Sequence, residues 1–315
     1  MSTKILHITN GDSTTKYLKK LQFEGQFITW REMLCEGKTA VQVGSEQFWK
    51  LRFDFLKTSY KISKKQFIEL TLKEYRMLCK QKRQNEIVLW FEHDLFCQIN
   101  MIAVLSWLKR YRKGRKISLV CSGNIAGSDQ LFGLSQLSEK QLKKHYQEKI
   151  ELTEDDIEYA DYVWQLYCAN NPIKLHNVYK YQPSQTFKYL TGGLLSHLQR
   201  FPTIGNGMNA LENKIINLVK KEEFSNEKEF VAKLLKLDAR YGFGDVQYFK
   251  KIDELKHLFG SLSPVKLNET GQKVQQRLLN VYANLRNDYS YLGGAKKYNF
   301  LYDNSSQKLL KITSL

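Results

Sequence analysis

Two short apolar segments, each followed at once by a cluster of polar residues, constrain the fold of this chain most strongly. Residues 4–9 are mostly apolar and lead into Asn-Gly-Asp-Ser at 10–13. Residues 86–91 are also mostly apolar and lead into Glu-His-Asp at 92–94. In an open parallel sheet, ligands bind outside the carboxyl ends of the strands. The two clusters therefore predict a binding site at one edge of such a sheet.

Strand-length apolar segments alternate with amphipathic helices through the first 121 residues. Four strands are predicted, at 4–9, 26–30, 86–91 and 116–121, and four helices, at 14–21, 45–58, 63–82 and 96–111. This alternation is typical of βαβ units, which place helices on both faces of a mainly parallel sheet. The predicted fold class is therefore α/β, with a three-layer, open, Rossmann-like sheet.

The rest of the chain is mostly helical. One Pro and two Gly at 201–207 predict a linker. The expected regions are an α/β ligand-binding domain at 1–135, a helical region at 136–207 and a helical domain at 208–315. In the last region, helices are expected at 208–222, 226–237, 244–259 and from 267, followed by a hairpin of 295–302 with 308–313. This order suggests a winged-helix domain, and it fits a plain helical cap with a hairpin as well.

The formal net charge of +17 attracts polyanions. Nucleic acid, a phosphorylated ligand and an anionic surface are all open as partners. The densest basic run, residues 108–116, suits either the solvated end of a helix or a phosphate site. A phosphate-binding loop is usually richer in Gly and Ser, so the helix end is favoured.

The five cysteines are widely spaced and form no Cys-x-x-Cys pair, which argues against a zinc ribbon or a thioredoxin-type site. Their odd number and the apolar surroundings of three of them fit reduced thiols in the cytosol. The chain begins directly with a strand and shows no signal-peptide pattern. Its most apolar stretch, 101–108, is far shorter than the ~20 residues that span a bilayer. We therefore expect a cytoplasmic protein without a membrane partner.

The first polar cluster has three interpretations. Gly11 can turn the chain while Asp12 or Ser13 caps the next helix. The same backbone can hold a phosphate or carboxylate at the helix N-terminus. The third interpretation is nucleophilic catalysis, because Gly-Asp-Ser after a first strand resembles the nucleophile block of the Gly-Asp-Ser-Leu esterases. Those enzymes carry an Asp-x-x-His pair, which this chain lacks, so His7 or His93 would have to act as the base.

The second cluster also has three interpretations: a metal site, an acid–base pair, or a helix cap. Successive residues of a strand point to opposite faces, so all three side chains converge only if the chain turns there. Asp94 at the N-cap is the simplest interpretation. Gln98 lies one turn after Asp94 and can share its site. A divalent metal is possible, but a second histidine at supporting spacing is lacking.

The candidate residues follow from these clusters and from the end of the second strand. Residues expected to bind the ligand are His7, Thr9, Asn10, Gly11, Asp12, Glu32, Glu92 and Gln98, and those expected to act in catalysis are His93, Asp94 and Ser13. No cofactor is predicted. The histidines at 145, 176, 197 and 257 are interpreted as surface residues or as core residues with satisfied hydrogen bonds.

Three motifs, in this order over about the first 125 residues, resemble an uncharacterised bacterial family, the domain of unknown function numbered 1835. They are His-Ile-Thr-Asn-Gly-Asp-Ser at 7–13, Trp-x-Glu-x-Leu-x-Glu-Gly at 30–37 and Leu-Trp-Phe-Glu-His-Asp-Leu-Phe-Cys-Gln at 89–98. Lys38 is a departure, because Pro is expected after Gly37. The resemblance implies a prokaryotic cytosolic protein and supplies no activity, cofactor or catalytic residue.

The leading functional prediction is binding of an anionic ligand, a nucleotide or a nucleic-acid phosphate, at the ends of the first and third strands. If the protein is an enzyme, we expect hydrolysis or phosphate-ester chemistry with His93 as general base. One alternative is a non-enzymatic nucleic-acid-binding regulator that acts through 208–315. A second alternative is a serine esterase with Ser13 as nucleophile.

Overall fold

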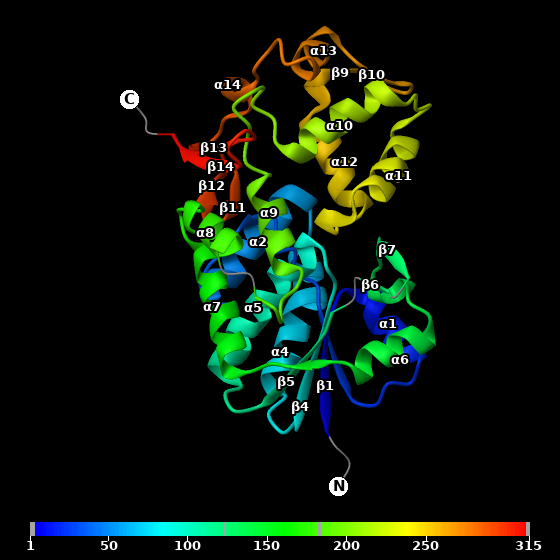
Figure 1. Cartoon of the computed structure of the whole chain (residues 1–315), viewed down its shortest axis with the longest axis vertical. Helices are drawn as coiled ribbons and strands as arrows, with labels where there is room; N and C mark the ends of the chain where they lie inside the picture. The colour runs from blue at the N-terminus through cyan, green and yellow to red at the C-terminus, as the bar shows by residue number, and fades with distance from the viewer. Residues whose placement is uncertain (1–3, 122–123, 126, 182–183, 313–315) are drawn as a thin grey trace.

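The computed structural model describes residues 4–121, 124–125, 127–181 and 184–312. An α/β unit occupies the lower part of Figure 1, and a smaller, mostly helical unit formed by the later residues lies above it. One hydrophobic core runs through both, from Leu6 in the first strand to Leu309 in the last hairpin. The two units are therefore packed together as one body.

The main sheet has five strands in the order β2 (Gln26–Trp30), β1 (Ile5–Asn10), β4 (Glu86–Phe91), β5 (Lys116–Cys121) and β8 (Ile150–Glu151). The short β8 is antiparallel to β5, and the other pairs are parallel. The four predicted strands and the mainly parallel α/β sheet are confirmed. The chain passes from β1 out to β2 and then returns to β4 on the other side of β1. The direction of winding therefore reverses between β1 and β4.

Helices cover both faces of this sheet (Figure 1). On one face α1 (Asp12–Lys20) and α6 (Glu139–Gln147) pack on Val88 and Trp90. Leu89 and Phe91, which alternate with them along β4, belong to the larger core on the other face. In the α/β unit, the helices that contribute to that larger core are α2 (Glu46–Tyr60), α4 (Lys73–Lys80), α5 (Leu95–Tyr111), α7 (Glu154–Cys168), α8 (Ile173–Tyr181) and α9 (Leu190–Leu198). The short α3 (Lys64–Phe67) packs on α2 through Phe67 and Trp49.

Two details of the α/β unit differ from the predicted elements. The helix expected over 63–82 contains a π-helical turn, η1 (Ile68–Leu72), between α3 and α4. Short elements fill the connection after β5, namely β6 (Asn124–Ile125), β7 (Ser128–Leu131) and η2 (Leu134–Gln136).

The basic run 108–116 lies at the end of α5. There, Arg112 Nη2 donates to the carbonyl of Leu78 at 2.8 Å. Arg112 thus caps the last turn of α4.

The helical unit begins after the predicted linker. It comprises α10 (Ala210–Lys221), α11 (Glu227–Leu237), η3 (Ala239–Tyr241), α12 (Asp245–Glu254), η4 (Lys256–Leu258), β9 (Phe259–Leu262), β10 (Val265–Leu267), α13 (Glu269–Gln275) and α14 (Tyr282–Leu285). The predicted helix over 244–259 is wrong at its end, since the α-helix stops at Glu254. Asn268 donates its Nδ2 to the carbonyl of His257 and its backbone N–H to that of Leu258, so this stretch is held by the next turn of chain.

The predicted C-terminal hairpin of 295–302 with 308–313 is confirmed in part: β13 (Phe300–Asp303) pairs with β14 (Lys308–Lys311), whereas residues 295–299 lie outside the hairpin and residue 313 lies outside the described residues. It follows β11 (Tyr291–Gly293), β12 (Ala295–Lys296) and η5 (Lys297–Asn299). Strand β11 also pairs in parallel with β3 (Gly37–Lys38), which lies in the loop after β2. The sequence patterns missed this pairing. It fastens the end of the chain to the α/β unit.

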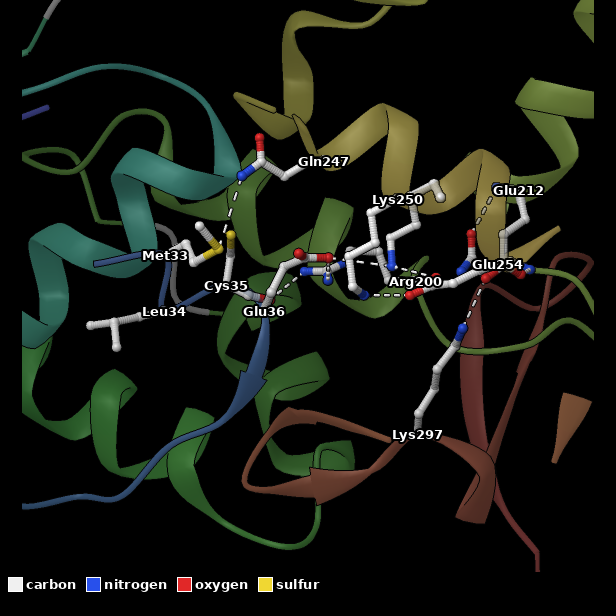
Figure 2. Close-up of polar contacts among 12 residues, drawn as sticks. Met33, Leu34, Cys35, Glu36, Arg200, Glu212, Gln247, Lys250, Glu254 and Lys297 are labelled. Atoms are coloured by element: carbon white, nitrogen blue, oxygen red, sulfur yellow. Dashed lines mark hydrogen bonds and ion pairs between the residues drawn. The ribbon is translucent and has the colours of Figure 1, made fainter. Parts of the chain in front are cut away.

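A cluster of buried ion pairs joins the same loop to the helical unit (Figure 2). The Glu36 carboxylate lies 3.4 Å from Arg200 Nη2, at the end of α9, and 3.4 Å from Lys251 Nζ, on α12. Nearby, Lys297 Nζ donates to Glu212 Oε1 at 2.8 Å. Glu36 and Arg200 are each 4% exposed, so the Glu36–Arg200 pair is almost fully withdrawn from water. In the described part of the chain, no helix has the length and apolar character needed to cross a membrane.

Candidate functional site

The two polar clusters meet at the carboxyl ends of β1 and β4. Asn10, the last residue of β1, donates its Nδ2 to Cys97 Sγ at 3.0 Å. Its Oδ1 accepts a hydrogen bond from Asn100 Nδ2 at 2.7 Å. Asn100 Nδ2 also donates to the carbonyl of Glu32, after β2. Side chains of α5 therefore connect the ends of neighbouring strands.

The N-terminus of α1 is open. Its N-cap residue, Gly11, has φ +87°, a conformation that favours glycine, and no side chain caps the helix. A Cβ built at Gly11 would meet no atom within 4 Å, so space lies in front of it. The Gly11 N–H itself donates to the carbonyl of Trp30 at 3.1 Å. The N–H groups of the first helical turn lie next to this space.

Asp12 does not cap α1. Its carboxylate instead forms two hydrogen bonds with Arg31, at 2.8 and 3.0 Å. The hydrogen bonds from Arg31 lower the pKa of Asp12. Arg31 also donates to Glu74 Oε1 at 3.2 Å and so is held between α1 and α4. Ser13 is exposed on the same turn.

The N-terminus of α5 is capped, as the sequence predicted. Asp94 Oδ1 accepts a hydrogen bond from the Cys97 N–H at 2.8 Å. Gly242, from the helical unit, lies directly against Asp94, and a Cβ at residue 242 would be 2.1 Å from Asp94 Oδ1. The helical unit therefore covers this part of the sheet edge. Sequence analysis missed Gly242, because nothing in the local pattern relates it to Asp94.

Burial shifts the pKa values of all three residues of the second cluster. Burial, aided by the nearby charge of Asp94, raises the pKa of Glu92 to about 7. Burial likewise raises the pKa of Asp94 to about 6. Burial lowers the pKa of His93, so that its imidazole is neutral at pH 7. The carboxyl groups can thus hold protons near neutral pH, and His93 can accept one.

The three side chains do not converge, which agrees with the alternation of strand residues. Glu92 Oε1 accepts a hydrogen bond from the Leu134 N–H at 2.7 Å. The His93 ring packs edge-on against Tyr189, with 5.9 Å between centroids. Cys97, and not His93, joins Glu92 and Asp94 in a set whose potential ligand atoms lie within 4.8 Å of one another. Cys97 Sγ accepts a hydrogen bond from Asn10, and Asp94 Oδ1 accepts one from the Cys97 N–H. Two of the three potential ligands are therefore already engaged with protein groups, so the set is not preorganised for a metal ion.

Three predicted ligand residues serve internal contacts. His7 Nδ1 accepts a hydrogen bond from Trp90 Nε1 at 3.0 Å, and its Nε2 lies 3.1 Å from the carbonyl of Glu24. Thr9 is buried and shares a hydrogen bond with Thr15 of α1. The third residue, Glu32, follows β2 and is also buried.

Glu32 forms an almost fully buried ion pair with Arg52, with 2.9 Å between Glu32 Oε2 and Arg52 Nε.

The positions of the two histidines bear on the role of Ser13. His7 is engaged with Glu24 and Trp90, and His93 packs on Tyr189, so neither histidine is placed by these contacts to activate Ser13.

A cavity of about 870 Å³ lies beside the end of β5. Gln98 contributes to its wall and donates its Nε2 to the carbonyl of Glu92 at 2.6 Å. Gln98 thereby links the wall of the cavity to the backbone of the second cluster. Two basic residues, Lys144 and Lys188, also line it.

Two buried polar side chains, Asn100 and His197, were not among the predicted site residues. Asn100 is a polar residue within an apolar helix, which is a signal for a buried hydrogen bond. His197 was expected to be exposed or satisfied, yet it is fully buried and neither ring nitrogen has a hydrogen bond within the described chain. Burial lowers the pKa of His197 to about 3. The centroid of its ring lies 4.8 Å from that of Tyr167. The environment of His197 thus depends on tertiary contacts that the local sequence does not show.

No protein-family model matches this sequence, and no curated protein is significantly similar to it. Neither result bears on the resemblance to the bacterial family, which stays a prediction. The functional argument therefore depends on the site itself.

Proposed function

We propose that this protein binds an anionic ligand, a nucleotide or a nucleic-acid phosphate, at the sheet edge between β1 and β4. The observation that carries this proposal is the open N-terminus of α1 at the point where the winding of the sheet reverses. In open α/β sheets this reversal creates the crevice in which ligands bind. An uncapped helix N-terminus offers backbone N–H groups and a partial positive charge to an anion.

The charges around the edge support an anion. Arg31 lies beside the N-terminus of α1, although Asp12 partly neutralises its charge through an ion pair. Glu92 and Asp94 would repel an anion if both were ionised. Their raised pKa values reduce that repulsion near neutral pH. The net charge of +17 adds a general attraction for anions.

If the site is catalytic, we propose hydrolysis or phosphate-ester chemistry. The neutral imidazole of His93 would accept a proton from an attacking water, and protonated Glu92 would donate one to the leaving oxygen. The pKa shifts support these roles near pH 7, because His93 is then neutral and Glu92, with a pKa of about 7, is partly protonated, whereas Asp94, with a pKa of about 6, is mostly ionised. Hydrolysis is the second part of the proposal and depends on the first.

The substitution Ser13→Asp tests anion binding without harming the fold. A carboxylate in the first turn stabilises a helix by ~0.3–1 kcal/mol, because it opposes the positive end of the dipole. The same carboxylate occupies and repels the proposed anion site. We expect unchanged or slightly raised thermal stability and at least about a tenfold loss of affinity for phosphate-bearing ligands in calorimetric titration.

Ser13→Asn is the matched control, because it has nearly the same shape as Ser13→Asp and no charge. It should bind almost as the parent does. Equal affinity of the parent and Ser13→Asp would exclude the N-terminus of α1 as the anion site.

The nucleic-acid regulator has less support. Helix α12, which a winged-helix protein would present to DNA, turns part of its surface inward. Gln247 Nε2 contacts Met33 Sδ at 3.9 Å, and Lys251 is paired with Glu36. We therefore prefer the strand-end site.

A further inference from the structure

The cavity beside β5 has a buried polar atom with no partner. Gln98 is only 1% exposed. Its Nε2 donates to the carbonyl of Glu92, which fixes the orientation of the amide, because a carbonyl accepts only from a donor. Gln98 Oε1 accepts no hydrogen bond from any described residue. Buried acceptors are rarely left unpaired, so this oxygen points to a ligand that donates a hydrogen bond.

The surroundings of Gln98 specify more of that ligand. Phe187 and Met101, both almost fully buried, contribute apolar surface to the cavity, and Tyr189 adds a second aromatic ring. Such walls suit a flat, largely apolar group. A volume of about 870 Å³ is within the usual range for a small-molecule site.

The rim of the cavity is basic. Lys144 and Lys188 line it, and Glu148 is the acidic residue of the lining. Lys144 is close to Glu148, with 3.7 Å between the charged atoms, and both side chains are largely exposed. The cavity therefore combines apolar walls, an unpaired hydrogen-bond acceptor in Gln98 and two exposed lysines, of which Lys144 is close to Glu148.

We infer that this cavity holds the base of a nucleotide. The base would lie against Phe187 and donate an N–H to Gln98 Oε1, while the phosphate reaches the N-terminus of α1. Adjacent strands are about 4.8 Å apart, so the ends of β1 and β5 are about 10 Å apart, a span that suits one nucleotide. This inference rests on the proposed function, since it names the ligand of the same strand-end site.

The test separates the base from the phosphate. Affinities for adenosine and guanosine 5′-monophosphate and for ribose 5-phosphate are measured by calorimetry on the full chain. If the base occupies the cavity, at least one nucleotide should bind about tenfold or more tightly than ribose 5-phosphate. Gln98→Met keeps the side-chain volume and removes the acceptor. It should weaken nucleotide binding about tenfold and leave ribose 5-phosphate unaffected.

Two further variants keep the test decisive. Gln147→Met makes the same change on an exposed position of α6 outside the cavity and should bind as the parent does. Ile150→Trp adds bulk to the cavity from a residue that is 38% exposed, so it blocks the base even if Gln98→Met fails to fold. Equal binding of nucleotides and ribose 5-phosphate, or full nucleotide affinity in both cavity variants, would overturn the inference.

The outcomes distinguish this inference from the proposed function. Ribose 5-phosphate binding that is lost in Ser13→Asp, with no gain from a base, supports the anion site and rejects the cavity. Nucleotide binding that needs Gln98 but is indifferent to Ser13→Asp supports the cavity and rejects the anion site. A 5′-phosphorylated tetranucleotide identifies the source: binding as tight as the monophosphate indicates the end of a nucleic acid, and much weaker binding indicates a free nucleotide.

Discussion

Neutralising Glu36 should destabilise the folded protein strongly. Glu36 is the carboxylate between Arg200 and Lys251, each 3.4 Å away, and Tyr60 donates a further hydrogen bond to it. Glu36→Gln keeps the shape of the side chain and removes its charge. Arg200 is then buried without the charge of Glu36, and Lys251 keeps its ion pair with Glu254, at 3.0 Å. Removing one partner of a buried ion pair costs about 3–5 kcal/mol.

The pKa of Glu36 gives a second route to this magnitude. Burial alone would raise the pKa, but Lys251 and Arg200 hold it at about 2, against 4.5 in the unfolded chain. This difference corresponds to about 3 kcal/mol of stability. The folded pKa is the lower one, so the contribution is complete above about pH 4.5 and is lost as the pH falls toward 2.

Urea unfolding, followed by tryptophan fluorescence at pH 7 and at pH 3, measures both effects. We expect Glu36→Gln to lower the free energy of unfolding by about 3 kcal/mol at pH 7 and by clearly less at pH 3. The control is Glu158→Gln. The side chain of Glu158 is 62% exposed, so its ion pair with Lys109 should contribute no more than about 1 kcal/mol to stability. A loss at pH 7 within 1 kcal/mol of the control would refute the reasoning.

Two further substitutions probe the sheet edge. The pKa of Glu92 is raised to about 7, so the folded chain keeps a proton that the unfolded chain loses near 4.5, and stability from this group falls as the pH rises between those values. Glu92→Gln should therefore be more stable than the parent above pH 7, by up to about 3 kcal/mol in urea unfolding, and a parallel pH profile would contradict this. Gly242→Ala should destabilise by about 1–3 kcal/mol, because Gly242 has φ +65° and its Cβ would clash with Asp94. In thermal melts the control Gly205→Ala, which meets no atom within 4 Å, should stay near the parent, and equal melting of both variants would argue against the clash.

The strands were predictable because burial on both faces leaves a clear pattern. All six residues of β4 are buried, and in sequence they form a continuous run that ends at a polar cluster. The N-cap role of Asp94 was also predictable, since the cap and the helix are adjacent in the chain. The end of α12 was not, because Asn268, more than ten residues away, holds the carbonyls of His257 and Leu258.

The site was predictable in position and less so in detail. Residue order placed Asn10 and Glu92 at the same edge of the sheet, but it could not show which side chains face the ligand space. His7 and Glu32 are chemically capable, and each found a partner elsewhere, Trp90 for His7 and Arg52 for Glu32. The orphaned oxygen of Gln98 depends on an amide orientation that only three-dimensional structure reveals.

The pairing of β3 with β11 bears on how the protein is made. Gly37 is aligned with Leu292, about 255 residues later in the chain. A ribosome adds about 5–20 residues per second, so the partner of β3 emerges roughly 13–50 s after it. During that interval the loop after β2 lacks β11, and for most of it the carboxylate of Glu36 also lacks Lys251 of α12. The pairing of β3 with β11 therefore forms late, after nearly all of the α/β unit has been synthesised.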